Sequence, residues 1–272
     1  MLALRIIPNK SKETKMKQVL KMSAISTALL TLPMMANADV LASVKPLGFI
    51  TSSIANGVTD TQILVPAGAS PHDYSLKLSD VQKVKSADLV VWVGEDIDAF
   101  LAKPISQIDS KKIINISEIP EIKPLLSKVH HEHYHEGDED EHGHDHKHGH
   151  DHKHEHGHDH EHHHHDVDEN GLSVNWHLWY SPAISQIVAQ KVADKLTEQY
   201  PDKKELIAKN LADFNRTLTE QSDKIKAQLA PLKDKGFFVF HDAYSYFNDA
   251  YGLNQTGYFT INPLVAPGAK TI

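Results

Sequence analysis

Apolar residues in the first half of the chain fall into short runs separated by amphipathic stretches. Strands are predicted at residues 40–44, 62–65, 89–93 and 112–116, and helices at 47–58, 79–86 and 96–101. The run from Leu89 to Val93 is apolar throughout, which is typical of a strand buried on both faces of a parallel sheet. Strands that alternate with helices predict βαβ units, whose ligands bind at the carboxyl ends of the strands.

The second half begins with two long helical patterns. Ile184, Val188, Val192 and Leu196 lie on one face of a helix that is predicted to start at Ser181-Pro182 and to end near Tyr200-Pro201. A second helix, capped by Asp202 and ended by Pro231, is roughly 40 Å long at ~1.5 Å per residue. Strands at 236–240 and 258–261 follow, with a helix at 243–251 between them.

These patterns predict an α/β fold of two lobes joined by the long helix. The first lobe spans residues 39–200, the linker helix 201–230, and the second lobe 231–272. Each lobe is expected to hold a parallel sheet flanked by helices. Only about two strand-helix units follow the long helix, whereas four precede it, so we expect the second lobe to be incomplete at Ile272.

The first 38 residues have the pattern of a secretory signal peptide. Several lysines precede an apolar run from Met22 to Met35, and Ala36-Asn37-Ala38 matches an A-x-A cleavage site. The run is too short and too rich in Ser and Thr for a membrane anchor. Met16 is a possible true start, since a complete signal follows it. With no cysteine in the chain, lipid attachment to an N-terminal cysteine, disulfides and thiolate metal sites are excluded, and we expect a periplasmic protein of a Gram-negative bacterium.

Composition singles out residues 130–169, which hold eighteen of the twenty-one histidines. This run also carries fourteen acidic residues and two lysines, whereas the rest of the chain after residue 38 is nearly neutral. It has too few apolar residues to pack a core, so it is expected to be a disordered insertion in the first lobe. The nearly neutral remainder argues against nucleic acid or an anionic membrane as its partner.

The three histidines outside this run are His72, His177 and His241. Taken singly, a histidine near an apolar strand is usually a hydrogen-bonded structural residue. His72 and His241, however, each follow a predicted strand, and His177 lies between Trp176 and Trp179, which could form a dry wall. Three imidazoles in one place suit Zn²⁺.

Four segments, three of which contain these histidines, resemble a known family. They are Gly68-Ala69-Ser70-Pro71-His72-Asp73-Tyr74, Ala87-Asp88-Leu89-Val90-Val91-Trp92-Val93-Gly94, His177-Leu178-Trp179-Tyr180-Ser181-Pro182 and Val239-Phe240-His241-Asp242-Ala243-Tyr244. In content and order they resemble the zinc-specific periplasmic solute-binding proteins of ABC importers, the ZnuA type. The resemblance extends from Asp39 to Ile272 and includes the His-rich insertion.

The resemblance implies that Zn²⁺, the transported ligand, is held in a cleft between the lobes by His72, His177 and His241. It also implies a monomer that delivers zinc to a membrane permease with its cytoplasmic ATPase. Some ZnuA-like proteins have a glutamate ligand immediately before the first histidine, where this chain has Pro71. Water is therefore the expected fourth ligand, and a carboxylate beyond residue 272 is the alternative. Asp73 and Asp242 are expected to orient histidine rings or face solvent.

The His-rich run is expected to act as an auxiliary, low-affinity zinc collector. Zinc binding must order a flexible segment, and this loss of conformational entropy weakens the affinity, whereas a preformed cleft avoids it. Two other functions compete with delivery to a transporter. A zinc chaperone or storage protein would act mainly through the run, and a zinc hydrolase would use three histidines and water. The H-E-x-x-H matches of the chain all lie in the low-complexity His-rich run, where spacing means little, which argues against the hydrolase.

Overall fold

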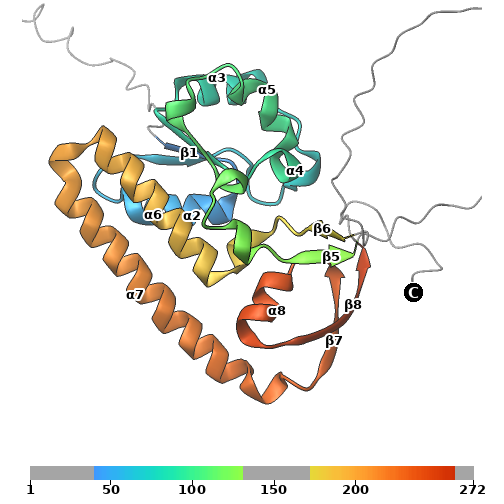
Figure 1. The fold of residues 1–272 in the computed structure, drawn as a ribbon. Helices are drawn as coiled ribbons and strands as arrows, with labels where there is room; N and C mark the ends of the chain where they lie inside the picture. Colours follow the sequence, from blue (N-terminus) through green and yellow to red (C-terminus); the bar gives the residue numbers. More distant parts are fainter. Residues whose placement is uncertain (1–39, 131–171, 261–272) are drawn as a thin grey trace, which may run out of the picture. The chain divides into compact units, whose positions relative to one another are not determined.

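The computed structural model describes residues 40–130 and 172–260, which form an α/β fold of parallel strands flanked by helices (Figure 1). The predicted signal peptide lies outside the described residues, as does the His-rich run except His130. Within the described part of the chain, no helix is long and apolar enough to cross a membrane.

The first sheet consists of four parallel strands in the order β2-β1-β3-β4. They are β1 (Val40–Ala42), β2 (Thr61–Ile63), β3 (Leu89–Trp92) and β4 (Ile113–Asn115). In the register, Leu41 is paired with Gln62 on one side and Val90 on the other. All four predicted strands are thus confirmed, and β3 is buried at each of its positions, as its continuous apolar run predicts.

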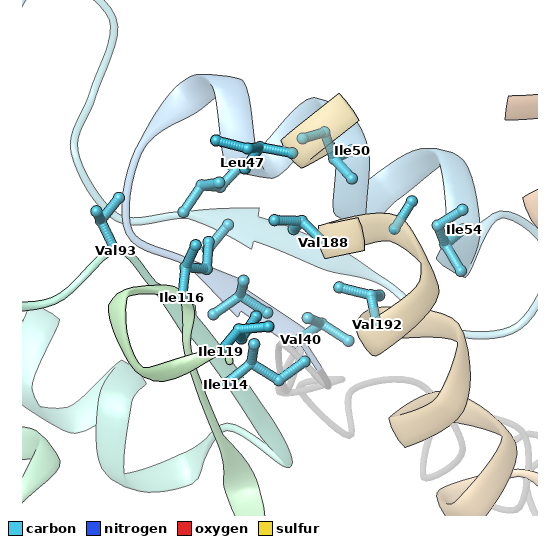
Figure 2. Close-up of a cluster of buried hydrophobic side chains, with 14 of the residues drawn as sticks. Val40, Leu47, Ile50, Ile54, Val93, Ile114, Ile116, Ile119, Val188 and Val192 are labelled. Carbon is cyan, nitrogen blue, oxygen red and sulfur yellow. The ribbon is translucent and has the colours of Figure 1, made fainter. Parts of the chain in front are cut away.

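Alternate residues of the central strands enter two separate hydrophobic cores, because side chains alternate between the faces of a strand. Val40 and Val91 belong to the larger core, together with residues of α2 (Lys45–Ala55), α6 (Pro182–Gln199) and α7 (Lys204–Leu229). Figure 2 shows Val40 in this core with Leu47 of α2 and Val188 of α6. Leu41 and Val90 belong to the smaller core, which contains residues of α3 (Leu78–Ser86) and α5 (Ala102–Ile105). Helices therefore cover both faces of the sheet.

Helix α6 begins as its sequence predicts. The hydroxyl of Ser181 accepts a 3.2 Å hydrogen bond from the backbone N–H of Ile184, and Pro182 occupies the first helical position. The predicted face is buried, with Ile184, Val188 and Leu196 all in the larger core. By contrast, the helix predicted at 96–101 is divided into α4 (Glu95–Asp98) and a 3₁₀ turn, Ala99–Leu101.

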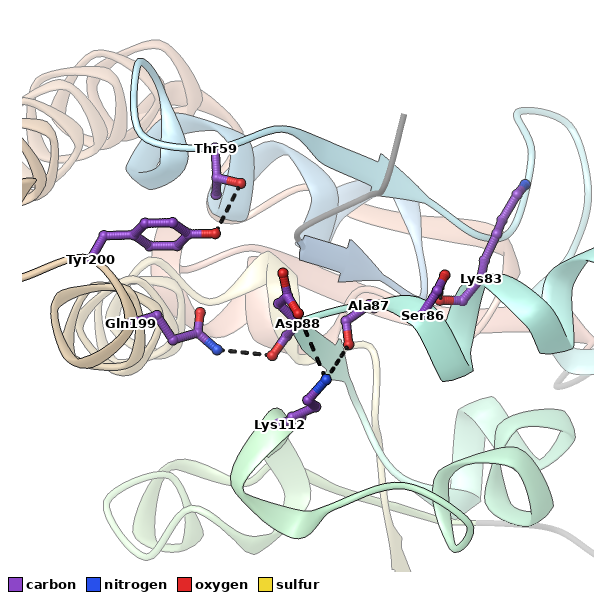
Figure 3. Close-up of polar contacts among 8 residues, drawn as sticks. All are labelled: Thr59, Lys83, Ser86, Ala87, Asp88, Lys112, Gln199 and Tyr200. Atoms are coloured by element: carbon purple, nitrogen blue, oxygen red, sulfur yellow. Dashed lines mark hydrogen bonds and ion pairs between the residues drawn. The ribbon is translucent and has the colours of Figure 1, made fainter. Parts of the chain in front are cut away.

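Polar contacts join the end of α6 to the amino ends of β3 and β4 (Figure 3). Gln199 donates a 2.8 Å hydrogen bond to the carbonyl of Asp88, and the ammonium of Lys112 lies 3.7 Å from the Asp88 carboxylate. Tyr200 donates a 3.4 Å bond to the hydroxyl of Thr59. These contacts lie at the opposite ends of the strands from the predicted ligand-binding edge.

Helix α7 is the predicted long helix, and its 26 residues span about 39 Å. The predicted cap at Asp202 is wrong, because Pro201–Lys203 form a 3₁₀ turn and the helix starts at Lys204. Near its start, Ile207 is buried in the larger core. Near its other end, the hydroxyl of Ser222 lies 3.3 Å from that of Tyr251 in α8. The division of the chain into two lobes on either side of α7 stays a prediction.

A second sheet pairs β7 (Gly236–His241) in parallel with β8 (Asn254–Thr260), and α8 (Ser245–Tyr251) connects them. This is the predicted strand-helix-strand unit, although β8 begins four residues before the predicted start at residue 258. Gly252 ends α8 with φ of 66°, the left-handed conformation that glycine adopts readily. The side chains of Phe238 and Phe240 on β7 are 61% and 54% exposed.

A short antiparallel hairpin was not predicted. It pairs β5 (Lys128–His130) with β6 (Leu172–Val174), so that His130 lies opposite Leu172. The predicted start of the insertion at residue 130 therefore needs correction, because His130 belongs to a strand. Strand β5 has the sequence Lys128-Val129-His130 with a single apolar residue, so no apolar run marks it as a strand.

Candidate metal centre

Three different elements carry the three isolated histidines. His72 lies in a 3₁₀ turn, Pro71–Asp73, that follows the loop after β2, and its backbone N–H donates a 3.2 Å hydrogen bond to the hydroxyl of Ser70. His177 lies three residues beyond β6, immediately before the 3₁₀ turn Leu178–Tyr180. His241 is the last residue of β7. The three rings therefore come from three segments that lie far apart in the sequence.

The structure brings these three rings together. Their centroids are 5.3 Å apart for His72 and His177, 5.5 Å for His72 and His241, and 4.8 Å for His177 and His241. One nitrogen from each ring lies within 4.8 Å of the other two. The Nε2 atoms of His72 and His177 are 3.3 Å apart, which matches the spacing of about 3.3 Å between two ligands of a tetrahedral zinc ion at ~2.0–2.1 Å.

The surroundings keep two of these imidazoles neutral. Burial lowers the pKa of His177 to about 3, with smaller contributions from His241 and His72. Burial also lowers the pKa of His72, followed by the effect of His241, while Asp73 acts in the opposite direction. His72 is the most exposed of the three, so solvent moderates its shift. A neutral imidazole offers a lone pair, so both rings are prepared to bind a metal ion near neutral pH.

A residue that the sequence did not single out holds the ring of His177. The side-chain oxygen of Asn175 lies 2.7 Å from Nδ1 of His177 and accepts a 3.1 Å hydrogen bond from its backbone N–H. Of the two aspartates expected to orient histidine rings or face solvent, Asp73 is exposed, in agreement with the second alternative, and the carboxylate of Asp242 accepts a 3.0 Å bond from Gln255. Nothing in the pattern around residue 175 marks an asparagine as a ring partner.

A series of aromatic side chains begins next to His177. Trp179 meets His177 edge-on, with centroids 5.4 Å apart, and Tyr180 is the next ring at 6.0 Å from Trp179. Tyr180 in turn lies 5.2 Å from Tyr244. Trp176 and Trp179 both pack against the larger core, and Trp179 is the one whose ring lies against His177.

The donor set around the three histidines contains nitrogen only. Among residues 40–130 and 172–260, no carboxylate joins the three imidazoles within metal-binding distance. Pro71, at the position of a glutamate ligand in some similar proteins, has no side-chain donor. Such an arrangement favours Zn²⁺ over Mn²⁺, which prefers more oxygen ligands, and leaves a coordination position for water or another group.

Comparison with known proteins identifies relatives over nearly the whole described chain. A family model described as ZnuA, the periplasmic component A of a zinc-uptake complex, matches residues 40–272. The high-affinity zinc uptake system protein ZnuA of Haemophilus influenzae is 78% identical over 266 residues, which cover 94% of this chain and 79% of that protein. The corresponding protein of Haemophilus ducreyi is 52% identical, over 93% of this chain and 76% of its own.

Solved structures show the same fold at much lower sequence identity. A crystal structure of ZnuA superposes with a TM-score of 0.62 at 20% identity, covering 86% of this chain and 74% of that one. This likeness supports the α/β architecture of parallel sheets flanked by helices with one long helix.

Proposed function

This chain belongs to the ZnuA family of periplasmic zinc-uptake components, and we propose that it captures Zn²⁺ with His72, His177 and His241. The observation that carries the proposal is the convergence of three ring nitrogens within 4.8 Å, two of them already at the spacing of zinc ligands. Zinc is the cargo, so the site must hold the ion and later release it. The family consists of binding proteins, and the chain is therefore not an enzyme.

Water is the proposed fourth ligand, and a carboxylate from beyond residue 272 is the alternative. Three neutral imidazoles leave the site with the full positive charge of the ion. A carboxylate ligand would lower this net charge, whereas a water ligand would not. A water ligand leaves an exchangeable position, through which the ion can enter and leave without displacing a protein side chain.

The proposed place of this protein is the periplasm, where it delivers zinc to the membrane permease and cytoplasmic ATPase of an ABC importer. Residues 1–38 would direct export and be removed, and the cysteine-free chain would act as a monomer without a lipid anchor. In this proposal the lobes are residues 39–200 and 231–272, with the linker helix at 201–230 and the metal in the cleft between them.

The His-rich run would serve the cleft as a collector of weakly bound zinc. Its acidic residues attract cations, and its many imidazoles bind them with an ordering cost that the three preplaced rings avoid. A storage or chaperone function would instead place most of the bound zinc in the run. The two functions differ in stoichiometry, since delivery needs one tight site and storage needs many similar ones.

The test is a zinc titration against a competing chelator with His72→Ala, His177→Ala and His241→Ala, each compared with the wild type. Each substitution should lower the affinity of the tightest site by more than the roughly 10- to 100-fold that outer-shell changes cost. A matched control replaces residues 131–171 with a two-residue turn between the paired strands β5 and β6. It should lose weak sites only, and loss of the tightest site in this control would refute the proposal.

A further inference from the structure

The amide of Asn175 determines which nitrogen of His177 carries a proton. Its oxygen faces the backbone N–H of His177, which can only donate, while its nitrogen donates a 3.4 Å hydrogen bond to the carbonyl of Asp242. Flipping the amide would place a donor against a donor and an acceptor against an acceptor. Nδ1 of His177 is 2.7 Å from the same oxygen, so Nδ1 must carry the hydrogen.

This tautomer leaves the lone pair of His177 on Nε2. Nε2 is also the atom that lies 3.3 Å from Nε2 of His72, on the side of the ring where the histidines converge. The opposite tautomer would put a hydrogen on the atom that faces the ion. The hydrogen bond from Nδ1 to Asn175 therefore selects the form of His177 that can act as a metal ligand, and it also limits rotation of the ring.

Asn175 is itself held from several directions. It is only 4% exposed, and its backbone N–H donates a 2.9 Å hydrogen bond to the carbonyl of Ser127, beside β5. The backbone N–H of Ser127 in turn donates a 3.1 Å bond to the hydroxyl of Tyr246, a buried residue of α8. Through Asp242, the side chain of Asn175 also reaches the residue next to His241.

We propose that Asn175 is a positioning residue of the metal centre. It fixes the tautomer and rotation of the His177 ring and ties that ring to the chain beside His241. The consequence for zinc affinity rests on the proposed function, whereas the tautomer of His177 is a property of the zinc-free protein.

The first test measures zinc affinity in Asn175→Ala, Asn175→Asp and a control, Asn210→Ala. The control residue is also buried, at 9% exposure, and donates bonds of 2.9 and 2.8 Å to the carbonyls of Ile54 and Asn56, outside the metal centre. Asn175→Ala should weaken zinc binding by about 10- to 100-fold. Asn175→Asp retains an acceptor for Nδ1 and should bind zinc more tightly than the alanine variant. Asn210→Ala should lose stability but keep wild-type affinity.

The second test reads the tautomer directly, from long-range ¹H–¹⁵N spectra of histidine side chains in the zinc-free protein lacking residues 131–171. His177 should have its hydrogen on Nδ1 in the wild type and in Asn175→Asp, and a mixture of tautomers in Asn175→Ala. A hydrogen on Nε2 of the wild type, or an alanine variant with unchanged tautomer and affinity, would overturn the proposal. If the alanine variant does not fold, the wild-type spectrum and the aspartate variant decide.

These outcomes separate the two proposals. If His177→Ala binds zinc as tightly as the wild type while the tautomer depends on Asn175, the proposed zinc ligands are wrong and the positioning of the ring stands. If His177→Ala loses zinc while Asn175→Ala changes neither affinity nor tautomer, the zinc ligands stand and Asn175 is structural only.

Discussion

The hydroxyl of Ser43 donates a 2.7 Å hydrogen bond to the carboxylate of Asp98 in the interior of the fold, where both residues are buried. The same carboxylate oxygen accepts a 2.8 Å bond from the backbone N–H of Val93. Ser43 follows β1 and Val93 follows β3, so Asp98 of α4 joins the carboxyl ends of two neighbouring strands. Burial raises the pKa of Asp98 to about 6, although both hydrogen bonds act to lower it.

Asp98 should make the free energy of unfolding depend on pH. Its pKa is about 6 in the folded chain and near 3.8 when unfolded, so the folded state binds the extra proton. The stability that this proton provides is present below the unfolded pKa and is lost as pH rises through about 6. Asp98→Asn does not titrate, so between pH 4 and pH 8 the variant should gain about 2 kcal/mol relative to the wild type. Urea denaturation at several pH values measures this, and a pH-independent difference would contradict it.

Zinc binding should release fewer protons than three ordinary histidines would. At pH 5.5, imidazoles with a pKa near 6.5 would release nearly three protons in total on binding the ion. Because the pKa of His177 is lowered to about 3 and that of His72 is also lowered, we expect fewer than two. Calorimetry in buffers of different ionisation enthalpy counts the protons, using the protein without residues 131–171, which removes every histidine of the His-rich run except His130. Release of nearly three protons would show that these rings are not kept neutral.

Gly94 should tolerate no side chain. Its φ is 140°, and a Cβ atom there would lie 2.5 Å from the hydroxyl oxygen of Ser117 and 3.2 Å from the amide oxygen of Asn115. Gly94→Ala should lower the free energy of unfolding by at least the ~1–3 kcal/mol of a strained backbone. Gly68→Ala is the matched control, since φ is 87° but no atom lies within 4 Å of the added Cβ. Chemical denaturation of both should show the greater loss at residue 94, and equal losses would exclude the steric part of this account.

The start of α7 should contribute more to stability than its end. Ile207 is 1% exposed in the larger core, and Ile207→Ala should cost about 2–5 kcal/mol in unfolding free energy. Leu229, the last residue of the same helix, is only partly buried, so Leu229→Ala should cost less. Neither residue is near the three histidines in sequence, and both variants should bind zinc as the wild type does. Equal losses would mean that the core packs evenly along α7.

Strands and helices with strong periodicity were predictable from the sequence. The uniformly apolar β3 and the buried face of α6 were both found, because burial on two faces or on one stripe leaves a direct pattern in the residues. The hairpin of β5 and β6 was not predictable. Strand β5 has only one apolar residue, so no apolar run marks it, and the pairing joins positions on either side of a segment that the structure does not describe.

The candidate site was predictable as a set of residues but not as a geometry. Setting aside the His-rich run left His72, His177 and His241, and the strand-end rule fits His241 well, because it is the last residue of β7. His177, however, is placed by the hairpin and by Asn175, which are tertiary features without a local signature. The binding of zinc by these histidines stays a prediction until it is measured.

The register of the hairpin has a consequence for the evolution and engineering of this protein. Because His130 and Leu172 are paired on neighbouring strands, the two ends of any segment that connects them lie close together. For a flexible connection, each doubling of length costs only about 0.6 kcal/mol of closure entropy. The hairpin is therefore a natural graft point, where a segment can be lengthened, shortened or exchanged for a reporter while Asn175 and His177 keep their positions.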